Sequence, residues 1–302
     1  MKNSIILSNK KAICYSGYRD GQKPGESYPS YDEIKEDLLL LQNDWNCLRL
    51  YDCDIHSETV LKVIQKEKMN FQVMLGAYIE AEQNNPTCPW GGMYSEETLM
   101  KNKENNRRKM DKLICLANEY SSIVMALSVG NEACVDWTDH LVSAESVAEY
   151  VRIVKEKTSQ PVTFCDNYVP WLANLEKVAQ EVDFISIHTY PIWEYKNIDT
   201  AMAFTMDNFK AVSKKYPNKQ IVITEAGWAT KSNGRGINEC NANDELQKVY
   251  LEQLLKWSKE ENILVFVFEA FDENWKGSPD SDEPEKHWGI FYSDRTPKLY
   301  AR

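Results

Sequence analysis

The chain has 302 residues, of which 43% are apolar and 27% are charged, so its composition is typical of a globular protein. Its 46 acidic residues outnumber its 35 basic residues, and the formal net charge is −11. We therefore expect no nucleic-acid partner and no membrane partner, because both need clustered positive charge. The longest apolar run covers residues 263–268, whereas a membrane-spanning helix needs roughly twenty apolar residues.

The N-terminal segment and the cysteines bear on the cellular compartment. Only residues 5–7 of that segment form an apolar run, which is shorter than the core of a secretory signal. The eight cysteines include no CxxC pair, and several lie in apolar segments where a thiol acts as a small core residue. Unpaired thiols favour a reducing compartment, so we expect a cytoplasmic protein unless a leader has been removed.

Short apolar runs alternate with longer amphipathic stretches along the whole chain. Most of the runs are almost continuously apolar, as strands buried on both faces are. The runs predicted as strands cover residues 12–17, 47–51, 71–76, 123–129, 162–165, 184–188, 221–224 and 263–268.

Polar capping residues mark the starts of several helices between these runs. Ser30 and Glu33 form a capping box before residues 34–42. The other predicted N-caps are Ser57 for residues 58–68, Ser143 for residues 144–157 and Asn243 for residues 244–259.

The repeated strand–helix order predicts the fold. Eight such units in one chain favour an α/β fold, a closed parallel (β/α)₈ or TIM barrel. The alternative, a doubly wound open sheet, normally carries a glycine-rich phosphate-binding turn after its first strand, and residues 17–22 lack that glycine spacing. No linker or break in composition interrupts the chain, so we expect residues 1–302 to form a single catalytic domain. Its chemistry should lie at the carboxyl ends of the strands.

Two glutamates stand at predicted strand ends. Glu132 follows the fourth run in the sequence Gly-Asn-Glu, and Glu225 follows the seventh. A single glutamate at a strand end is more often solvated or ion-paired, but two that face one barrel mouth favour catalysis. Retaining glycoside hydrolysis needs such a pair, one carboxyl as acid/base and the other as nucleophile. The spacing alone does not say which is which. Asn131, beside Glu132, is a candidate ligand for a sugar hydroxyl.

Side chains on the same strand face as this pair are candidate supporting residues. Alternation along the second strand places Arg49 and Tyr51 on one face, and along the sixth it does so for His188 and Tyr190. Arg49 is interpreted either as the cation that keeps the nucleophile ionised or as a structural ion pair. Tyr190 is a candidate donor to Glu225, and His188 is equally compatible with a hydrogen-bonded core histidine.

Charged residues cluster after the eighth run, and such clusters usually lie on a solvated face; they are Glu269, Asp272, Glu273 and Lys276. The four histidines show neither HxH nor HExxH spacing, so we expect no metal site and no cofactor.

Most of the nine tryptophans follow predicted strands. Trp45 and Trp257 fall in or beside helices and are interpreted as packing residues. The others are Trp90, Trp137, Trp171, Trp193, Trp228, Trp275 and Trp288. A flat indole can cover the C–H face of a sugar ring without ordering many rotatable bonds, so their distribution indicates a sugar-binding mouth.

Taken together, these motifs resemble glycoside hydrolase family 17. The resemblance extends from about residue 12 to residue 298 and rests on Gly-Asn-Glu at 130–132, the run 183–191, Thr-Glu-Ala-Gly-Trp at 224–228 and Phe-Asp-Glu-Asn-Trp-Lys at 271–276. It implies a retaining enzyme on a (β/α)₈ barrel that acts on β-1,3-linked glucans, with Glu132 as acid/base and Glu225 as nucleophile. It also implies that Glu273 and Lys276 belong to the site.

Further matches and departures refine this resemblance. Tyr51 with Asp52 matches the family's second-strand element, and residues 285–289 match its late loop. Plant members commonly carry Ser or Thr at the position of Ala226 and Pro at that of Ala229. Residues 81–90 and 134–140 are similar to the bacterial branch, which includes glucanosyltransferases. The candidate substrate-binding residues are Tyr51, Asp52, Trp90, Asn131, Trp137, Tyr190, Trp193, Trp228, Glu273, Lys276 and Trp288, with Arg49 and His188 in support.

Three functions remain open from the sequence. The first is a hydrolase of laminarin-type β-1,3-glucan or its oligosaccharides, with the endo or exo mode undecided. The second is a β-1,3-glucanosyltransferase that uses the same two glutamates. The third, a non-catalytic glucan-binding barrel, is disfavoured because it would be expected to have lost one of them.

Overall fold

The structure is a computed structural model and describes residues 7–302, so most of the N-terminal run considered above lies outside the described residues. Eight parallel strands close into a barrel in chain order, which confirms the predicted (β/α)₈ fold. The strands are β1 (Ala12–Cys14), β2 (Cys47–Leu50), β3 (Gln72–Ala77), β4 (Val124–Asn131), β5 (Val162–Asn167), β6 (Ile185–His188), β7 (Ile221–Gly227) and β8 (Val265–Phe268).

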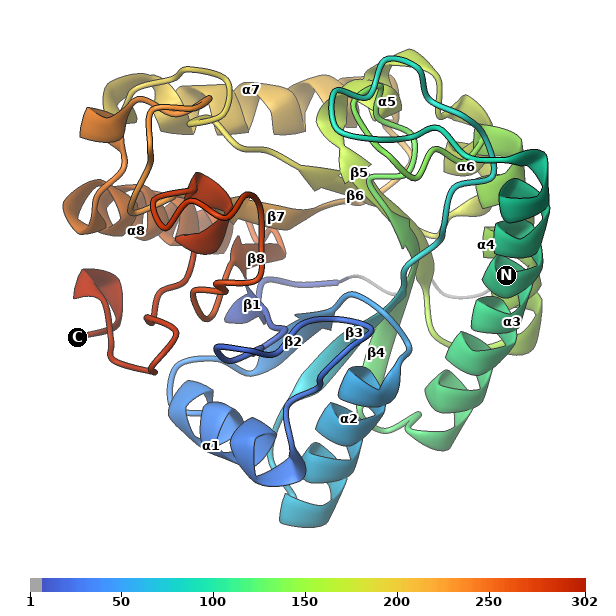
Figure 1. Ribbon diagram of the computed structural model, residues 1–302, viewed down its shortest axis with the longest axis horizontal. Helices are drawn as coiled ribbons and strands as arrows, with labels where there is room; N and C mark the ends of the chain where they lie inside the picture. The colour runs from blue at the N-terminus through green and yellow to red at the C-terminus, as the bar shows by residue number, and fades with distance from the viewer. Residues whose placement is uncertain (1–6) are drawn as a thin grey trace.

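Helices surround the barrel, as Figure 1 shows. They are α1 (Tyr31–Leu41), α2 (Ile55–Glu67), α3 (Glu96–Glu119), α4 (Ala144–Lys157), α5 (Tyr168–Ala173), α6 (Glu176–Glu181), α7 (Ile198–Lys215) and α8 (Asp244–Glu260). Three short 3₁₀ helices lie at Glu239–Asn241, Pro284–Lys286 and Leu299–Ala301. The strand side chains and the inner helix faces form one continuous apolar core, because each strand is covered on both sides.

The predicted strands all occur, and their ends differ from the prediction by a few residues. The difference that matters is in β7, which continues past Thr224 so that Glu225 lies within the strand. This extension pairs Ala226 with Val267 and Gly227 with Phe268. Gly227 permits this close approach of β7 to β8, because a Cβ at position 227 would lie 2.0 Å from the carbonyl oxygen of Phe268.

The helix starts test the capping predictions. Ser30 forms the predicted capping box with Glu33, and Ser143 and Asn243 cap α4 and α8 as predicted. The prediction for Ser57 is wrong. Asp54 caps α2 instead, accepting a hydrogen bond from the Ser57 backbone N–H at 3.2 Å. The helix therefore begins before Ser57, whose hydroxyl donates to the carbonyl of Asp52.

Two further observations concern the cysteines and the helix lengths. All eight cysteines are free. Within residues 7–302, every helix is too short or too polar to cross a lipid bilayer.

Candidate active site

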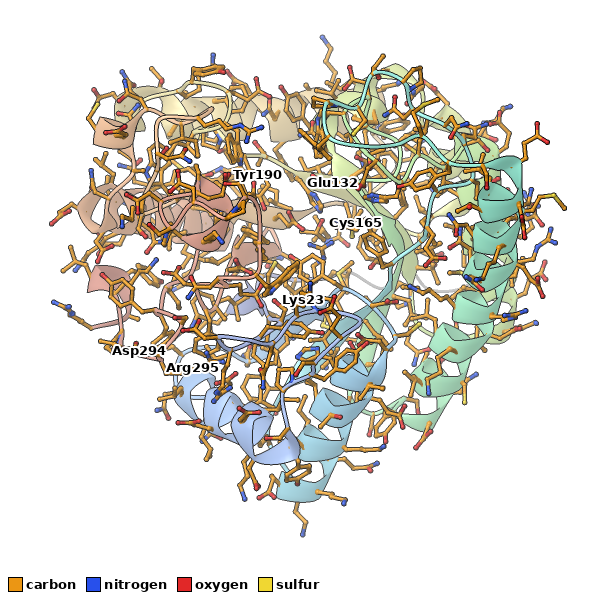
Figure 2. The ribbon with its side chains drawn as sticks, in the orientation of Figure 1. Lys23, Glu132, Cys165, Tyr190, Asp294 and Arg295 are labelled. Carbon is orange, nitrogen blue, oxygen red and sulfur yellow. The ribbon has the colours of Figure 1, made fainter. Side chains whose placement is uncertain are left out.

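The two glutamates meet at the centre of the barrel mouth. Glu132 directly follows β4, Glu225 lies in β7, and an oxygen of each carboxyl is within 4.8 Å of an oxygen of the other. Figure 2 places Glu132, Cys165 and Tyr190 near the centre of the ring of helices. Retaining glycosidases hold their carboxyls roughly 5–5.5 Å apart, whereas inverting enzymes separate them by about 6.5–9.5 Å. The separation therefore suits a retaining reaction.

Glu132 is placed by an unusual backbone turn. Gly130 has φ +83°, and a Cβ there would lie 2.8 Å from the Cδ1 atom of Ile79. Glu132 itself has φ +48°, and its backbone N–H donates to the carbonyl of Cys165 at 2.9 Å. Positive φ is costly for a residue with a side chain. The chain adopts positive φ where it leaves β4, and this turn directs the carboxyl of Glu132 toward the barrel mouth.

Glu225 lies in a dense set of hydrogen-bond donors. Its Oε1 atom accepts from Arg49 and, at 3.0 Å, from the Tyr51 hydroxyl. Its Oε2 atom accepts from the Tyr190 hydroxyl at 2.5 Å. Burial alone would raise the pKa of Glu225, but the charges of His188 and Arg49, with the donated hydrogen bonds, hold the pKa below its usual value. This carboxyl is therefore ionised, as a nucleophile must be.

His188 lies between the two carboxyls. Its Nδ1 atom is 2.9 Å from Oε1 of Glu132 and 3.4 Å from Oε2 of Glu225. Burial lowers the pKa of His188, but the charge of Glu225 and the hydrogen bonds to Cys165 and Glu132 outweigh burial and raise the pKa to about 10. The imidazole is thus a protonated donor. These three side chains are close enough to surround a metal ion, and His188 would have to release its Nδ1 proton to bind one.

Asn131 is oriented from both sides. Arg49 donates to its side-chain oxygen at 2.5 Å, and its backbone carbonyl lies 2.9 Å from Nε2 of His140. The other ring nitrogen of His140 is 2.8 Å from the Tyr78 hydroxyl. The Asn131 amide group is therefore fixed beside Glu132 with its N–H donors available. His140 was not among the sequence candidates, since a loop histidine carries no periodic signal.

The charged cluster after β8 is buried, so its interpretation as a solvated face is wrong for its three acidic members. Lys276 lies 2.6 Å from Glu269 and 2.8 Å from Glu273, and Lys298 lies 2.7 Å from Asp272. All three carboxylates are almost inaccessible to solvent. Buried charges are tolerated when they are paired, and that pairing across the β8 loop is not visible in the sequence pattern.

The charges of the pair affect a third carboxyl, that of Glu285. Glu285 belongs to the late loop that matched the family but was not a candidate residue. Burial raises the pKa of Glu285, and the charges of Glu132 and Glu225 add to this effect, whereas the charge of Lys276 opposes it. The resulting pKa is about 7.

The tryptophans separate into open and buried indoles. Trp90, Trp137 and Trp275 are exposed. Trp193 is partly buried and packs with a ring-centroid distance of 6.2 Å against Trp288. The remaining loop-side indoles, Trp171, Trp228 and Trp288, are fully buried.

Burial corrects two of the proposed sugar contacts. The Nε1–H of Trp228 donates to the carbonyl of Asn241 at 2.7 Å, and the indole packs on Tyr250. Trp288 packs edge-on against Tyr190, with ring centroids 5.0 Å apart. The expectation that each offers an open face to a sugar is therefore wrong. Both positions follow strands, but the chain folds back over them.

Asp52 is bound by residues of α3 and of the segment that follows β3. Its side chain lies 2.8 Å from Lys109 and accepts the backbone N–H of Tyr78 at 3.1 Å. It borders a groove of about 330 Å³ beside α3. These contacts connect the β2 and β3 ends and give Asp52 a structural role in this conformation.

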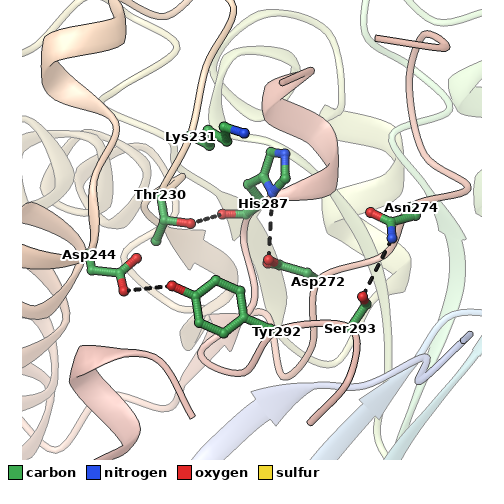
Figure 3. A pocket seen from close by; sticks show the side chains of 8 residues that line it. All are labelled: Thr230, Lys231, Asp244, Asp272, Asn274, His287, Tyr292 and Ser293. Atoms are coloured by element: carbon green, nitrogen blue, oxygen red, sulfur yellow. Dashed lines mark hydrogen bonds and ion pairs between the residues drawn. The ribbon is translucent and has the colours of Figure 1, made fainter. Parts of the chain in front are cut away.

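A separate cavity of about 270 Å³ lies between the β7–α8 connection and the segment after β8 (Figure 3). Thr230 donates to the carbonyl of His287 at 3.0 Å, His287 lies 3.6 Å from Asp272, and the Tyr292 hydroxyl donates to a carboxylate oxygen of Asp244 at 3.1 Å. None of the candidate substrate-binding residues lines this cavity. Its polar groups bind one another and connect the two segments.

Comparison with known proteins gives a family match over most of the chain. A family model described as the BtgE/BtgC glycoside hydrolase domain matches residues 12–289. A putative glucan endo-1,3-beta-glucosidase btgC of Aspergillus niger is 26% identical over 296 residues, which is 89% of this chain and 40% of that protein. A glucan 1,3-beta-glucosidase of Schizosaccharomyces pombe is 30% identical over 282 residues, covering 88% of this chain and 79% of that protein.

Solved structures share the fold over almost the whole chain. An endo-laminarinase from Formosa Hel1_33_131 superimposes with a TM-score of 0.84 and 27% identity, covering 99% of this chain and 88% of that one. A glycoside hydrolase family 17 β-1,3-glucanosyltransferase from Rhizomucor miehei gives a TM-score of 0.76 and 25% identity, covering 96% of each.

Proposed function

Because this chain belongs to the BtgE/BtgC glycoside hydrolase family, we propose that it is a retaining glycoside hydrolase that cleaves β-1,3-linked glucans. The resemblance to family 17 is confirmed by the family model and by the structural likeness to the Rhizomucor miehei enzyme. The substrate class is supported by the names of the relatives, a glucan 1,3-beta-glucosidase and an endo-laminarinase among them. The chain spans 40% of the Aspergillus niger relative, so the proposal concerns this barrel.

The single observation that carries the proposal is the carboxyl pair, with oxygens within 4.8 Å of each other and one carboxyl held ionised by surrounding donors. The environments of the two glutamates differ in a way that supports the proposed roles. Glu225 is bound by Arg49, Tyr51 and Tyr190. Glu132 is the more accessible, with 17% of its side chain exposed against 6% for Glu225. The nucleophile needs fixed charge, and the acid/base needs access to water.

The reaction then proceeds in two displacements. In the first, a Glu225 oxygen bonds to the anomeric carbon, the bond from that carbon to the bridging oxygen breaks, and the bridging oxygen takes the proton of Glu132. In the second, Glu132 accepts a proton from water, the water oxygen bonds to the anomeric carbon, and the bond to Glu225 breaks. The configuration at the anomeric carbon is retained because it is inverted twice.

Residues around the pair supply orientation. Tyr51, Tyr190 and Arg49 hold the Glu225 carboxylate in one position, so little reorganisation is needed on attack. The Asn131 amide can donate to a hydroxyl of the sugar beside Glu132. Lys276 and Glu273 are further candidates from the resemblance to family 17; Lys276 keeps 14% of its side chain exposed, whereas Glu273 is fully buried.

Mutation of each glutamate tests the assignment on laminarin and on an aryl β-glucoside. Glu225→Ala should abolish cleavage, and azide should restore turnover with release of an α-glycosyl azide, because the small anion fills the space of the lost carboxylate. Glu132→Ala should slow laminarin cleavage far more than cleavage of the aryl glycoside, whose leaving group needs no proton. Near-normal activity of Glu225→Ala, or equal losses on both substrates for Glu132→Ala, would contradict these roles.

Transfer to a sugar is the second candidate, and the likeness to the Rhizomucor miehei glucanosyltransferase favours it. Hydrolysis and transfer differ only in whether water or a glucan hydroxyl attacks the glycosyl-enzyme. Incubation with a single laminari-oligosaccharide distinguishes them. Shorter products alone indicate hydrolysis, whereas products longer than the starting sugar indicate transfer.

A further inference from the structure

Two open indoles stand together beside the barrel mouth. Trp90 lies on the loop between β3 and α3, Trp137 lies on the loop between β4 and α4, and their ring centroids are 6.2 Å apart at an interplanar angle of 51°. The exposed fractions are 61% for Trp90 and 39% for Trp137. Exposure of two large neighbouring aromatic side chains usually marks a binding surface.

The two loops form one unit, which Figure 1 shows side by side near α5 and α6. Asn85, almost completely buried, donates from its side chain to the carbonyls of Asp136 at 2.8 Å and Thr138 at 2.7 Å. Its backbone N–H donates to the carbonyl of Gly92 at 2.7 Å. The indoles are therefore held by a buried polar connection and are pre-organised, which lowers the entropy cost of binding.

The same unit carries the acid/base. Trp137 is five residues after Glu132, so their Cα atoms are at most about 18 Å apart. His140 joins the unit to the carbonyl of Asn131 and to the hydroxyl of Tyr78. The indole pair and the acid/base are thus fixed relative to each other.

The chemistry of the first displacement indicates which part of the glucan, on either side of the cleaved bond, this unit contacts. The bridging oxygen takes its proton from Glu132, so the leaving portion of the glucan departs next to that residue. Glu225 and Tyr190, on β7 and the β6–α7 connection, face the sugar that becomes bonded to the enzyme. A surface continuous with Glu132 therefore meets the leaving portion of the chain.

We propose that Trp90 and Trp137 form a glucosyl-binding platform for the leaving-group side of a β-1,3-glucan, beyond the cleaved bond. This inference rests on the proposed function and specifies its substrate as a glucan that continues past the cleaved bond. In the second displacement the same platform holds a glucan acceptor. The acceptor hydroxyl loses its proton to Glu132, its oxygen bonds to the anomeric carbon, and the bond to Glu225 breaks.

Paired substrates test the platform in Trp90→Ala, Trp137→Ala and the double variant. Laminarihexaose places sugars on both sides of the cleaved bond, whereas nitrophenyl β-laminaribioside places sugars only on the side that becomes bonded to the enzyme. We expect kcat/KM for the hexaose to fall about 10-fold for each single variant and about 100-fold for the double variant. The value for the nitrophenyl substrate should stay within about twofold of the parent, because loss of one stacking contact affects only a bound leaving-group sugar.

Acceptor and control measurements complete the test. With the nitrophenyl donor and added laminaritriose, the yield of transfer product should fall in the double variant. Met100→Ala changes an exposed apolar residue on α3 and should leave every value unchanged. Thermal unfolding of each variant reports its folding, and Trp90→Phe with Trp137→Phe preserves an aromatic face if truncation disturbs the loops.

Several results would overturn the inference. Unchanged hexaose cleavage in variants of an active enzyme would exclude a sugar platform. Equal losses on both substrates would place the indoles on the other side of the cleaved bond. A change in oligomeric state in the variants, with unchanged kinetics, would assign the surface to a second copy of the chain. Absence of glucan cleavage in the parent protein would instead refute the proposed function itself.

Discussion

Tyr190→Phe removes the hydroxyl that donates a hydrogen bond to Glu225, the proposed nucleophile. That hydroxyl donates to Oε2 of Glu225 at 2.5 Å, within a buried site. A hydrogen bond to a charged group contributes about 1.5–3 kcal/mol, and a free-energy difference of about 1.4 kcal/mol corresponds to one pKa unit. Since the bond favours the ionised carboxylate, its loss should raise the pKa of Glu225 by about 1–2.

The pH dependence of kcat/KM is the measurement. The nucleophile acts only when ionised, so the acidic limb of the profile should move to higher pH in Tyr190→Phe, and the maximum should fall about 10- to 100-fold. Tyr51→Phe is the matched variant. Its hydroxyl donates at a longer 3.0 Å to Oε1, which keeps the Arg49 contact, so its effect should be smaller. An acidic limb that stays in place in a folded Tyr190→Phe protein would refute this account of the nucleophile.

Two further predictions concern stability. His56 is buried against Tyr18, and burial lowers its pKa to about 4, so the unfolded chain binds a proton first as the pH falls from about 6.5. The free energy of unfolding should therefore be highest above pH 6.5 and fall by about 3 kcal/mol as the pH is lowered toward 4. His56→Phe should remove this pH dependence when unfolding is measured with a chemical denaturant. A difference between variant and parent that stays constant across this pH range would contradict the prediction. Gly227→Ala would place a Cβ 2.0 Å from the carbonyl of Phe268, and the displacement of β8 should cost about 3 kcal/mol or more. Gly21→Ala is the control, because no atom lies within 4 Å of a Cβ there although φ is +80°. This variant should lose only about 1 kcal/mol of stability. Equal losses of stability for the two variants in thermal unfolding would exclude the steric explanation.

Local patterns were sufficient for the fold and for part of the site. The apolar runs predicted the barrel strands because parallel strands covered on both faces need continuous apolar side chains. Alternation along a strand placed Arg49 with Tyr51 and His188 with Tyr190, and all four side chains lie within contact distance of Glu225. These results depend on periodicity, which short segments carry by themselves.

Burial of the loop side chains was not predictable in the same way. Trp90 and Trp228 both follow strands, yet one is exposed and the other is buried on Tyr250. Glu269 and Glu273 read as a solvated cluster, but Lys276 pairs with both inside the protein. Which side chain is covered depends on how a loop folds back, and that depends on contacts between segments far apart in the chain.

The amino-acid sequence by itself determined the strand order and the barrel and placed Glu132 and Glu225 at strand ends, because these follow from local periodicity and from residue type at strand ends. Only the tertiary structure decided how close the carboxyls stand, that one is ionised, and which indoles remain open. Closure of the barrel brings β2, β4, β6 and β7 to one mouth. Distance, burial and pKa arise from that convergence, since electrostatic and packing energies depend on neighbours in space and not along the chain.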